Sequence, residues 1–436
     1  MLAVHGGTPV LAPGALAPWP HVVEEDRRAV LRAMDEAVPW HWPMTAVREL
    51  EQAWGEACDM PYVVAANSGT AALHMAVAAA GVGPGDEVLV PADTFLASAS
   101  CVLQANAIPV FVDTDLATFA MDPARIEERI TARTRAIIAV DLNGLPADYD
   151  ALAEVARRHG LVLIEDAAQS HGATYRGRPA GGLGDLSGSS LNGSKCLSAL
   201  GEGGLFATRD EYQWRLARRV MMFGEELDGQ GRDYNARMMG WNYRIDVLAA
   251  AFAGSQLSRL GEMTRQRIAN GAALTAALDG VPGIRPPVVP PDRTHVYFFY
   301  PLLVRPEDLG AADIPVPVFR DAVERAVRAE GLGIMRWQPQ PVPAQTLFQE
   351  MRGYGRGCPW TCGHADGPHR YRPEEYPVAE EICARRLVLG QTFSSLGPPN
   401  DEAVMLRVAE VFHKVLVDER DALLSMARAD TVTAGR

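Results

Sequence analysis

The chain has 436 residues, enough to bury a large core, and its 48% hydrophobic and 22% charged residues are ordinary for a globular enzyme. A formal net charge of −13 without any basic run disfavours a nucleic-acid or anionic-membrane surface, so we expect neither partner. We also find no apolar run long enough to span a membrane and no pattern typical of a secretory signal at the start, and we therefore expect a cytoplasmic protein.

Short apolar runs alternate with helical patterns between about residues 60 and 210, which is typical of a mainly parallel sheet covered by helices. Runs rich in β-branched residues predict strands at 61–66, 87–90, 108–112, 135–140, 161–165 and 205–208. Helices are predicted at 70–81, between Asp148 and Gly160, and at 211–224. The sequence therefore predicts an α/β fold.

The pattern changes around 265–290, where we expect a proline-rich loop. A strand-like segment at 295–304 and a helix within 318–331 follow, and 340–376 is predicted to be an ordered irregular loop. We place a domain boundary at this change, with one domain over 1–265 and a smaller one over 266–436.

Six cysteines are too few for a disulfide framework in a chain of this length, and we expect most of them to be reduced. Cys358, Cys362, His364 and His369 lie close together and raise the alternative of a structural zinc ion. Their spacing matches no common zinc motif, so we predict no metal site.

Lys195 is one of only two lysines, the other being Lys414, and it lies in a segment rich in glycine and serine. The run from Gly188 to Gly193 resembles a nucleotide-binding P-loop, but Ser194 separates the second glycine from the lysine, which argues against nucleotide binding. A lysine held in such a loop can be desolvated and can react with a carbonyl to form a Schiff base. A surface lysine in a flexible turn is the alternative.

Glu165 and Asp166 end a predicted strand, and the carboxyl ends of parallel strands are where open α/β sheets bind ligands. A carboxylate in that place can keep a pyridinium nitrogen protonated, so that the ring accepts electrons from a substrate carbanion. An aspartate that only caps the following helix would show the same pattern.

Two further stretches follow predicted strands. Asn67, Ser68, Gly69 and Thr70 precede a helix, whose N-terminus favours a phosphate, although an N-cap alone would look alike. Phe95 could stack on a planar cofactor, although core packing is the commoner role of such an aromatic residue. In this order, the four features together describe a site for pyridoxal 5'-phosphate.

The motifs NSGTAAL, PADTF, EDAAQSHGA, Ser190-x4-Lys195 with GEGG, and GWNYR resemble those of the DegT/DnrJ/EryC1/StrS aminotransferases over roughly residues 20–260. These are pyridoxal-phosphate enzymes of fold type I, the aspartate-aminotransferase fold, that aminate keto-sugars and cyclitol ketones. The resemblance implies a large domain with a mainly parallel seven-stranded sheet and a smaller C-terminal α/β domain. It also implies that Lys195 forms the Schiff base and later moves the proton, and that Asp166 pairs with the pyridine nitrogen.

The resemblance assigns the other cofactor contacts as well. Gln169 would lie by the ring hydroxyl, and Phe95 would stack on the ring. Ser68, Gly69, Thr70 and Ser190 would hold the phosphate. Asn242 would reach the phosphate of the neighbouring subunit, which implies an obligate homodimer with shared active sites.

The opening LAVHGGTPVLAP is similar to the branch that includes scyllo-inosose and 2-deoxy-scyllo-inosose aminotransferases, whereas the C-terminal third departs from it. We therefore hypothesise a ping-pong transamination from glutamine or glutamate to a keto-sugar or cyclitol ketone in antibiotic biosynthesis, with Lys195 as the general base in both halves. Arg244 and Arg336 are candidates for binding the donor carboxylate. A dehydratase or oxidase acting on a sugar, or a regulatory protein that binds the cofactor without turnover, are the alternatives; relatives that dehydrate sugars carry His in place of this lysine.

Overall fold

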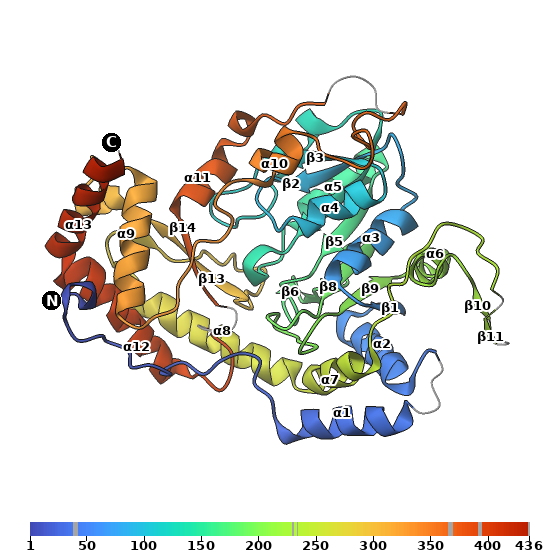
Figure 1. The fold of residues 1–436 in the computed structure, drawn as a ribbon, viewed down its shortest axis with the longest axis horizontal. Helices are drawn as coiled ribbons and strands as arrows, with labels where there is room; N and C mark the ends of the chain where they lie inside the picture. Colours follow the sequence, from blue (N-terminus) through green and yellow to red (C-terminus); the bar gives the residue numbers. More distant parts are fainter. Residues whose placement is uncertain (38–41, 229–230, 233, 365–368, 391–394, 435–436) are drawn as a thin grey trace.

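The computed structural model describes residues 1–37, 42–228, 231–232, 234–364, 369–390 and 395–434, and a seven-stranded sheet forms its centre (Figure 1). In the order β1-β9-β8-β5-β4-β2-β3, its strands are Tyr62–Ala66 (β1), Gly204–Thr208 (β9), Leu186–Ser190 (β8), Val162–Asp166 (β5), Thr134–Val140 (β4), Glu87–Pro91 (β2) and Ile108–Val112 (β3). Of these strands only β9 runs antiparallel to its neighbours, so the predicted α/β fold with a mainly parallel seven-stranded sheet is confirmed.

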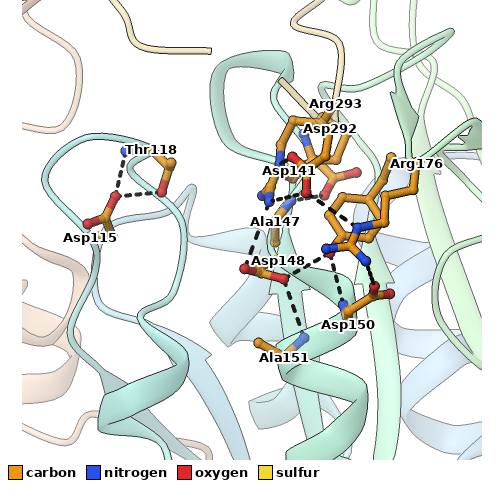
Figure 2. Close-up of polar contacts among 12 residues, drawn as sticks. Asp115, Thr118, Asp141, Ala147, Asp148, Asp150, Ala151, Arg176, Asp292 and Arg293 are labelled. Carbon is orange, nitrogen blue, oxygen red and sulfur yellow. Dashed lines mark hydrogen bonds and ion pairs between the residues drawn. The ribbon is translucent and has the colours of Figure 1, made fainter. Parts of the chain in front are cut away.

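Helices cover the sheet, and this explains why its strands are almost entirely buried. They include α3 (Gly69–Ala79), α4 (Ala97–Gln104), α5 (Tyr149–His159) and α6 (Glu211–Met221). Residues close in the sequence set the ends of helix α5. Asp148 accepts a 3.3 Å hydrogen bond from the N–H of Ala151 at the start of the helix (Figure 2). Gly160 ends the helix with a φ of 63°, as its position in the sequence predicted.

Two of the predicted boundaries were wrong. Residues 188–190 belong to strand β8 rather than to the loop before Lys195; this strand lacks β-branched residues, so the pattern did not reveal it. The small size of Gly188 is needed there, since an added Cβ would lie 2.8 Å from the Leu73 side chain. The region from 265 is also not yet loop, because α8 (Leu260–Ala277) continues through it and the proline-rich segment begins only afterwards.

A second sheet of three antiparallel strands lies beside the first, in the order β12 (Ile284–Arg285), β13 (Phe299–Val304) and β14 (Arg386–Gly390). Helices α8, α9 (Val316–Ala329), α12 (Glu402–His413) and α13 (Arg420–Ala434) share a hydrophobic core with it. Leu2 and Leu11 also join this core, which brings the N-terminus close to the C-terminal helices (Figure 1). The predicted strand at 295–304 and helix at 318–331 are thus present with shifted ends, while the predicted division at residue 265 falls within α8 and stays a prediction.

The remaining elements frame these two sheets. The helices are α1 (Glu24–Glu36), α2 (Thr45–Cys58), α7 (Val247–Ser258), α10 (Thr346–Gln349) and α11 (Pro377–Arg385), and the short strands are β6 (Thr174–Tyr175), β7 (Arg178–Pro179), β10 (Leu227–Asp228) and β11 (Gly231–Arg232). Short 3-10 helices lie at Ala3–His5, Pro123–Arg125, Glu127–Arg129, Leu142–Gly144, Pro306–Leu309, Val342–Ala344 and Pro373–Glu375, and a π-helical turn at Lys414–Asp418. Within the described ranges, no helix combines the length and the apolar character needed to cross a membrane.

The segment with the closely spaced cysteines contains a disulfide between Cys358 and Cys362, whose Cα atoms are 5.3 Å apart. Both sulfur atoms are therefore bonded to each other, and neither is a thiolate that could ligate zinc. The other four cysteines are reduced and buried, as expected for most of them.

Candidate active site

A cavity of about 400 Å³ opens at the carboxyl ends of the parallel strands and brings together residues that are far apart in the sequence. Eight of the nine predicted cofactor-binding residues line it: Ser68, Gly69, Thr70, Phe95, Asp166, Gln169, Ser190 and Lys195. Strand ends and the turns that follow them supply most of these side chains, which explains how local motifs spread over more than a hundred residues converge on one place.

Asp166 ends β5 and is buried, with 4% of its surface exposed. Ser98 donates a hydrogen bond of 2.7 Å from Oγ to one carboxylate oxygen, and the N–H of Ala168 donates one of 3.1 Å to the other. Burial raises the pKa of Asp166, whereas these two hydrogen bonds and the charge of Lys195 act in the opposite direction. The carboxylate is thus held by two donors and lines the same cavity as the cationic Lys195.

The amine of Lys195 lies 4.2 Å from the centre of the Phe298 ring. Burial lowers the pKa of Lys195 to about 8, although the charge of Asp166 opposes the shift. The backbone on which this side chain stands is also fixed, because Trp19 donates a 2.8 Å hydrogen bond from Nε1 to the carbonyl oxygen of Lys195. An amine with a pKa near neutrality is suited to reaction with an aldehyde and to proton transfer.

The start of helix α3 meets the end of strand β8 at very close range. Ser68 caps the helix by accepting a 3.1 Å hydrogen bond from the N–H of Ala71, so the N-cap interpretation of this serine is also correct. Gly69 permits the approach, since a Cβ at this position would lie 2.6 Å from the Cβ of Ser190. The result is a cradle formed by a helix N-terminus and a serine hydroxyl, both suited to a phosphate.

Gln169 is held from two sides. Its side-chain oxygen accepts a 2.7 Å hydrogen bond from the N–H of Asn143, in the turn that follows β4. The next residue, Ser170, donates a 2.7 Å hydrogen bond to Asp141. Asp141 also accepts a 3.0 Å bond from the N–H of Ala147 (Figure 2). This network fixes the backbone between β4 and α5 against the segment that carries Gln169.

Several cavity residues were not predicted as site residues. Trp337, Phe298 and Phe299 line the cavity and come from segments joined to the smaller sheet. Ser98, on α4, does not line the cavity but contacts it indirectly through its hydrogen bond to Asp166. No local pattern around Trp337 distinguished it from a core aromatic residue. Phe95, which was predicted, is 54% exposed, so its ring faces the cavity and solvent rather than the core.

Asn192 and Glu202 add a polar part to the cavity wall. The amide nitrogen of Asn192 donates a 2.7 Å hydrogen bond to the carboxylate of Glu202. The negative charge of Glu202 also supports the protonated form of Lys195. Sequence reasoning included Glu202 only as part of a motif and assigned no role to it.

Three predicted residues do not line this cavity. Asn242 is exposed and accepts a 2.9 Å hydrogen bond from Nε of Arg244. Arg336 forms ion pairs of 3.4 Å with Asp321 and 3.0 Å with Glu324. The proposed role of Asn242 in a neighbouring subunit and the roles of the two arginines in donor binding stay predictions.

The site fits the pyridoxal 5'-phosphate that the resemblance implies. The cradle between Gly69 and Ser190 leaves no room for a side chain but presents backbone N–H groups and a hydroxyl to a phosphate. The Asp166 carboxylate, the Lys195 amine and the exposed face of Phe95 supply the partners for a ring nitrogen, an aldehyde and a ring face.

Comparison with known proteins agrees with this geometry. The sequence profile of the DegT/DnrJ/EryC1/StrS aminotransferase family matches residues 21–365. An L-glutamine:2-deoxy-scyllo-inosose aminotransferase of Micromonospora echinospora is 35% identical over 447 residues, covering 97% of this chain and 99% of the relative. A GDP-perosamine synthase of Caulobacter vibrioides is 40% identical over 290 residues, covering 64% of this chain and 75% of the relative.

Among solved structures, an aminotransferase from Psychrobacter cryohalolentis matches with a TM-score of 0.78 at 27% identity, covering 92% of this chain and 99% of that structure. The fold, the arrangement of the cavity and the family profile therefore lead to one conclusion. The chain belongs to the DegT/DnrJ/EryC1/StrS aminotransferase family and is an aminotransferase for sugar-like ketones with pyridoxal 5'-phosphate as its cofactor.

Proposed function

We propose that this enzyme transfers an amino group from L-glutamine or L-glutamate to a keto-sugar or a cyclitol ketone similar to scyllo-inosose, in the biosynthesis of an aminosugar or aminocyclitol natural product such as an antibiotic. The observation that carries the proposal is the placement of Lys195 and Asp166 on the wall of a single cavity. The near full-length similarity to an enzyme named for L-glutamine and 2-deoxy-scyllo-inosose supports this choice of donor and acceptor.

Pyridoxal phosphate, when bound, supplies an aldehyde that exchanges amino groups and a ring that accepts electrons. Asp166 then holds a proton on the ring nitrogen, because a buried carboxylate stabilises the charged form of a base beside it. Through its Nζ, Lys195 would take a proton from the substrate carbon that bears the amino group. It would then deliver that proton to the carbon on the other side of the same nitrogen. Its pKa of about 8 suits both directions, since an effective general base titrates near the working pH.

The remaining wall suits a polyhydroxylated alicyclic ketone, either uncharged or linked to a nucleotide. Trp337 offers an apolar face to a ring, while Asn192 and Glu202 offer an amide and a carboxylate to hydroxyl groups. We also propose that two chains form a homodimer in which Asn242 of one chain completes the phosphate site of the other, since this exposed residue lies outside its own cavity.

The test has two stages with the purified protein. L-Glutamine is added first, and conversion of the bound cofactor to pyridoxamine phosphate is followed by absorbance. A panel of inososes and nucleotide-linked keto-sugars is then added, and formation of the amine is measured by mass spectrometry. A spectrum unchanged by glutamine and glutamate would favour the regulatory alternative, and release of a dehydrated or oxidised sugar would favour the other chemistries.

A further inference from the structure

A buried ion pair joins the two sheets next to the cavity. Arg386, the first residue of β14, and Asp93, in the turn after β2, are both fully buried at 0% exposure. The two guanidinium nitrogens Nη1 and Nη2 lie 2.6 and 2.8 Å from the two carboxylate oxygens. This bidentate geometry fixes the relative orientation of the two segments as well as their distance.

The arginine side of the pair holds one wall of the cavity. Arg386 donates a 3.1 Å hydrogen bond to the backbone oxygen of Trp337, and its guanidinium carbon lies 4.8 Å from the centre of the Trp337 ring. The indole also lies 5.4 Å from the Phe299 ring, centre to centre. Trp337 therefore takes its place in the cavity between an aromatic side chain and a cation.

Asp93 is connected to another part of the cavity wall through the residues that follow it in the chain. Thr94 and Phe95 follow Asp93 directly, and both line the cavity. The hydroxyl of Thr94 lies 2.9 Å from that of Ser98, which in turn donates to Asp166. A continuous set of contacts thus runs from the ion pair to the carboxylate at the centre of the site.

We infer that Asp93 and Arg386 are positioning residues that set the distance between the Trp337 wall and the Phe95 wall, and so determine which acceptor ketone the cavity admits. Neither residue lines the cavity, so they act through the side chains that they hold. The inference rests on the proposed function, because that proposal supplies the class of acceptor, a keto-sugar or cyclitol ketone. A donor can be recognised by its carboxylate, whereas an uncharged ketone depends on the shape of the walls.

Loss of a single partner could not distinguish this positioning role from a purely structural one. Replacing a buried ion pair by apolar residues of similar volume is often neutral or stabilising, while removal of one partner leaves an uncompensated charge. The informative variant therefore replaces both partners, Asp93→Leu with Arg386→Met. Arg386→Lys is the second variant, because it keeps the charge but loses the bidentate fork, and it serves if the double variant does not fold.

Four measurements test the inference on the cofactor-loaded enzyme. With 5-fluorotryptophan incorporated, the ¹⁹F resonance of Trp337, assigned with Trp337→Phe, should shift or broaden in both variants. The rate of the glutamine half-reaction should change by less than about threefold, whereas kcat/KM for the acceptor should fall about 10- to 100-fold, since small displacements of substrate-positioning groups have effects of this size. Cofactor affinity should stay within about threefold of the original value, which corresponds to less than ~1 kcal/mol.

Lys414→Met is the matched control, because it removes an ion pair of 2.7 Å with the buried Glu330 and neither residue lines the cavity. It should leave the Trp337 resonance and both half-reactions unchanged. The inference is overturned if the Trp337 resonance keeps its position in both pair variants, or if donor and acceptor rates fall equally. If the original enzyme reacts with glutamine but with no ketone of the panel, the proposed acceptor is wrong, and the Trp337 resonance alone decides the positioning role.

Discussion

The hydroxyl of Ser98 donates a 2.7 Å hydrogen bond to the Asp166 carboxylate, and both groups are buried. Burial by itself would favour a neutral carboxyl, which could not hold a proton on the cofactor ring by its charge. A hydrogen bond to the charged form lowers the pKa again, so a serine on α4 favours the ionised form of the Asp166 carboxylate on β5. If Asp166 acts as proposed, Ser98 supports that role, which its sequence context did not reveal.

Ser98→Ala should therefore raise the pKa of Asp166. The loss of one hydrogen bond to a charged group is worth about 1.5–3 kcal/mol, or roughly a 10- to 100-fold effect on the affected equilibrium. The acid limb of the pH profile of kcat should move to higher pH. Ser100→Ala is the control, because Ser100 lies on the same helix, bonds only weakly to the carbonyl of Ala97 at 3.4 Å and does not line the cavity. An acid limb that moves equally in both variants would contradict the assignment.

Asp166→Asn should increase the stability of the apoprotein at neutral pH. The pKa of Asp166 is raised in the folded state, so the folded protein holds this proton to a higher pH than the unfolded chain does. The carboxyl group consequently lowers stability as the pH rises above the usual range of a carboxyl group, and this loss is fully present once the folded-state group has ionised. The apo variant should melt at a higher temperature than the original at neutral pH, with a smaller difference in acid.

The cofactor-loaded form of the same variant should show the opposite effect. Loss of the partner for the ring nitrogen should lower kcat by about 10²-fold or more, the usual contribution of a group that controls protonation. Calorimetry of the apoprotein and steady-state kinetics check the two expectations separately. Unchanged turnover in Asp166→Asn would show that this residue does not take part in catalysis.

Gly69→Ala tests the phosphate cradle. The new Cβ would lie 2.6 Å from the Cβ and 2.9 Å from the Cα of Ser190, which forces strand β8 and helix α3 apart. Overpacking of this kind costs about 1–3 kcal/mol, and cofactor affinity should fall by roughly 10-fold or more. Gly83→Ala is a suitable control, since an added Cβ there meets nothing within 4 Å. Titration of each apoprotein with pyridoxal phosphate measures the difference, and equal affinities would show that the phosphate binds elsewhere.

Shared active sites can be tested by mixing two inactive chains. Lys195→Ala and Asn242→Ala should each abolish or strongly reduce turnover alone. When they are co-expressed with different tags and the mixed dimer is purified, one site of the two regains both Lys195 and Asn242, so about half of the original activity should return. No recovery in a dimer of confirmed composition would place both residues in the same chain's site.

The extent to which the sequence predicted the structure follows from the range of the interactions. Strands such as β4 and the capped helix α5 were predictable because β-branched runs and the Asp148 and Gly160 signals are local. Strand β8 was missed because small polar residues form it, and its place is set by neighbours such as Leu73. The close spacing of Cys358 and Cys362 raised zinc as an alternative, although no metal site was predicted, and it did not reveal the disulfide that the structure has there.

The same distinction applies to the site. Residues that lie within contiguous motifs, such as Ser68 and Lys195, could be predicted, since each motif joins a strand end to a turn. The pair of Asp93 with Arg386 could not, because the two residues are 293 positions apart in the sequence. Trp337 could not either, because its contact with Arg386 joins positions 49 residues apart. Such contacts depend on the tertiary packing of the two sheets and leave no local pattern.

The central claim is that the Lys195 amine bears the cofactor. Because the chain has only two lysines, reduction of the loaded enzyme with borohydride followed by peptide mass mapping gives an unambiguous answer. We predict that the phosphopyridoxyl group is found on Lys195, that Lys414 is unmodified, and that Lys195→Ala carries no label. A label on Lys414, or one that persists in Lys195→Ala, would contradict the account.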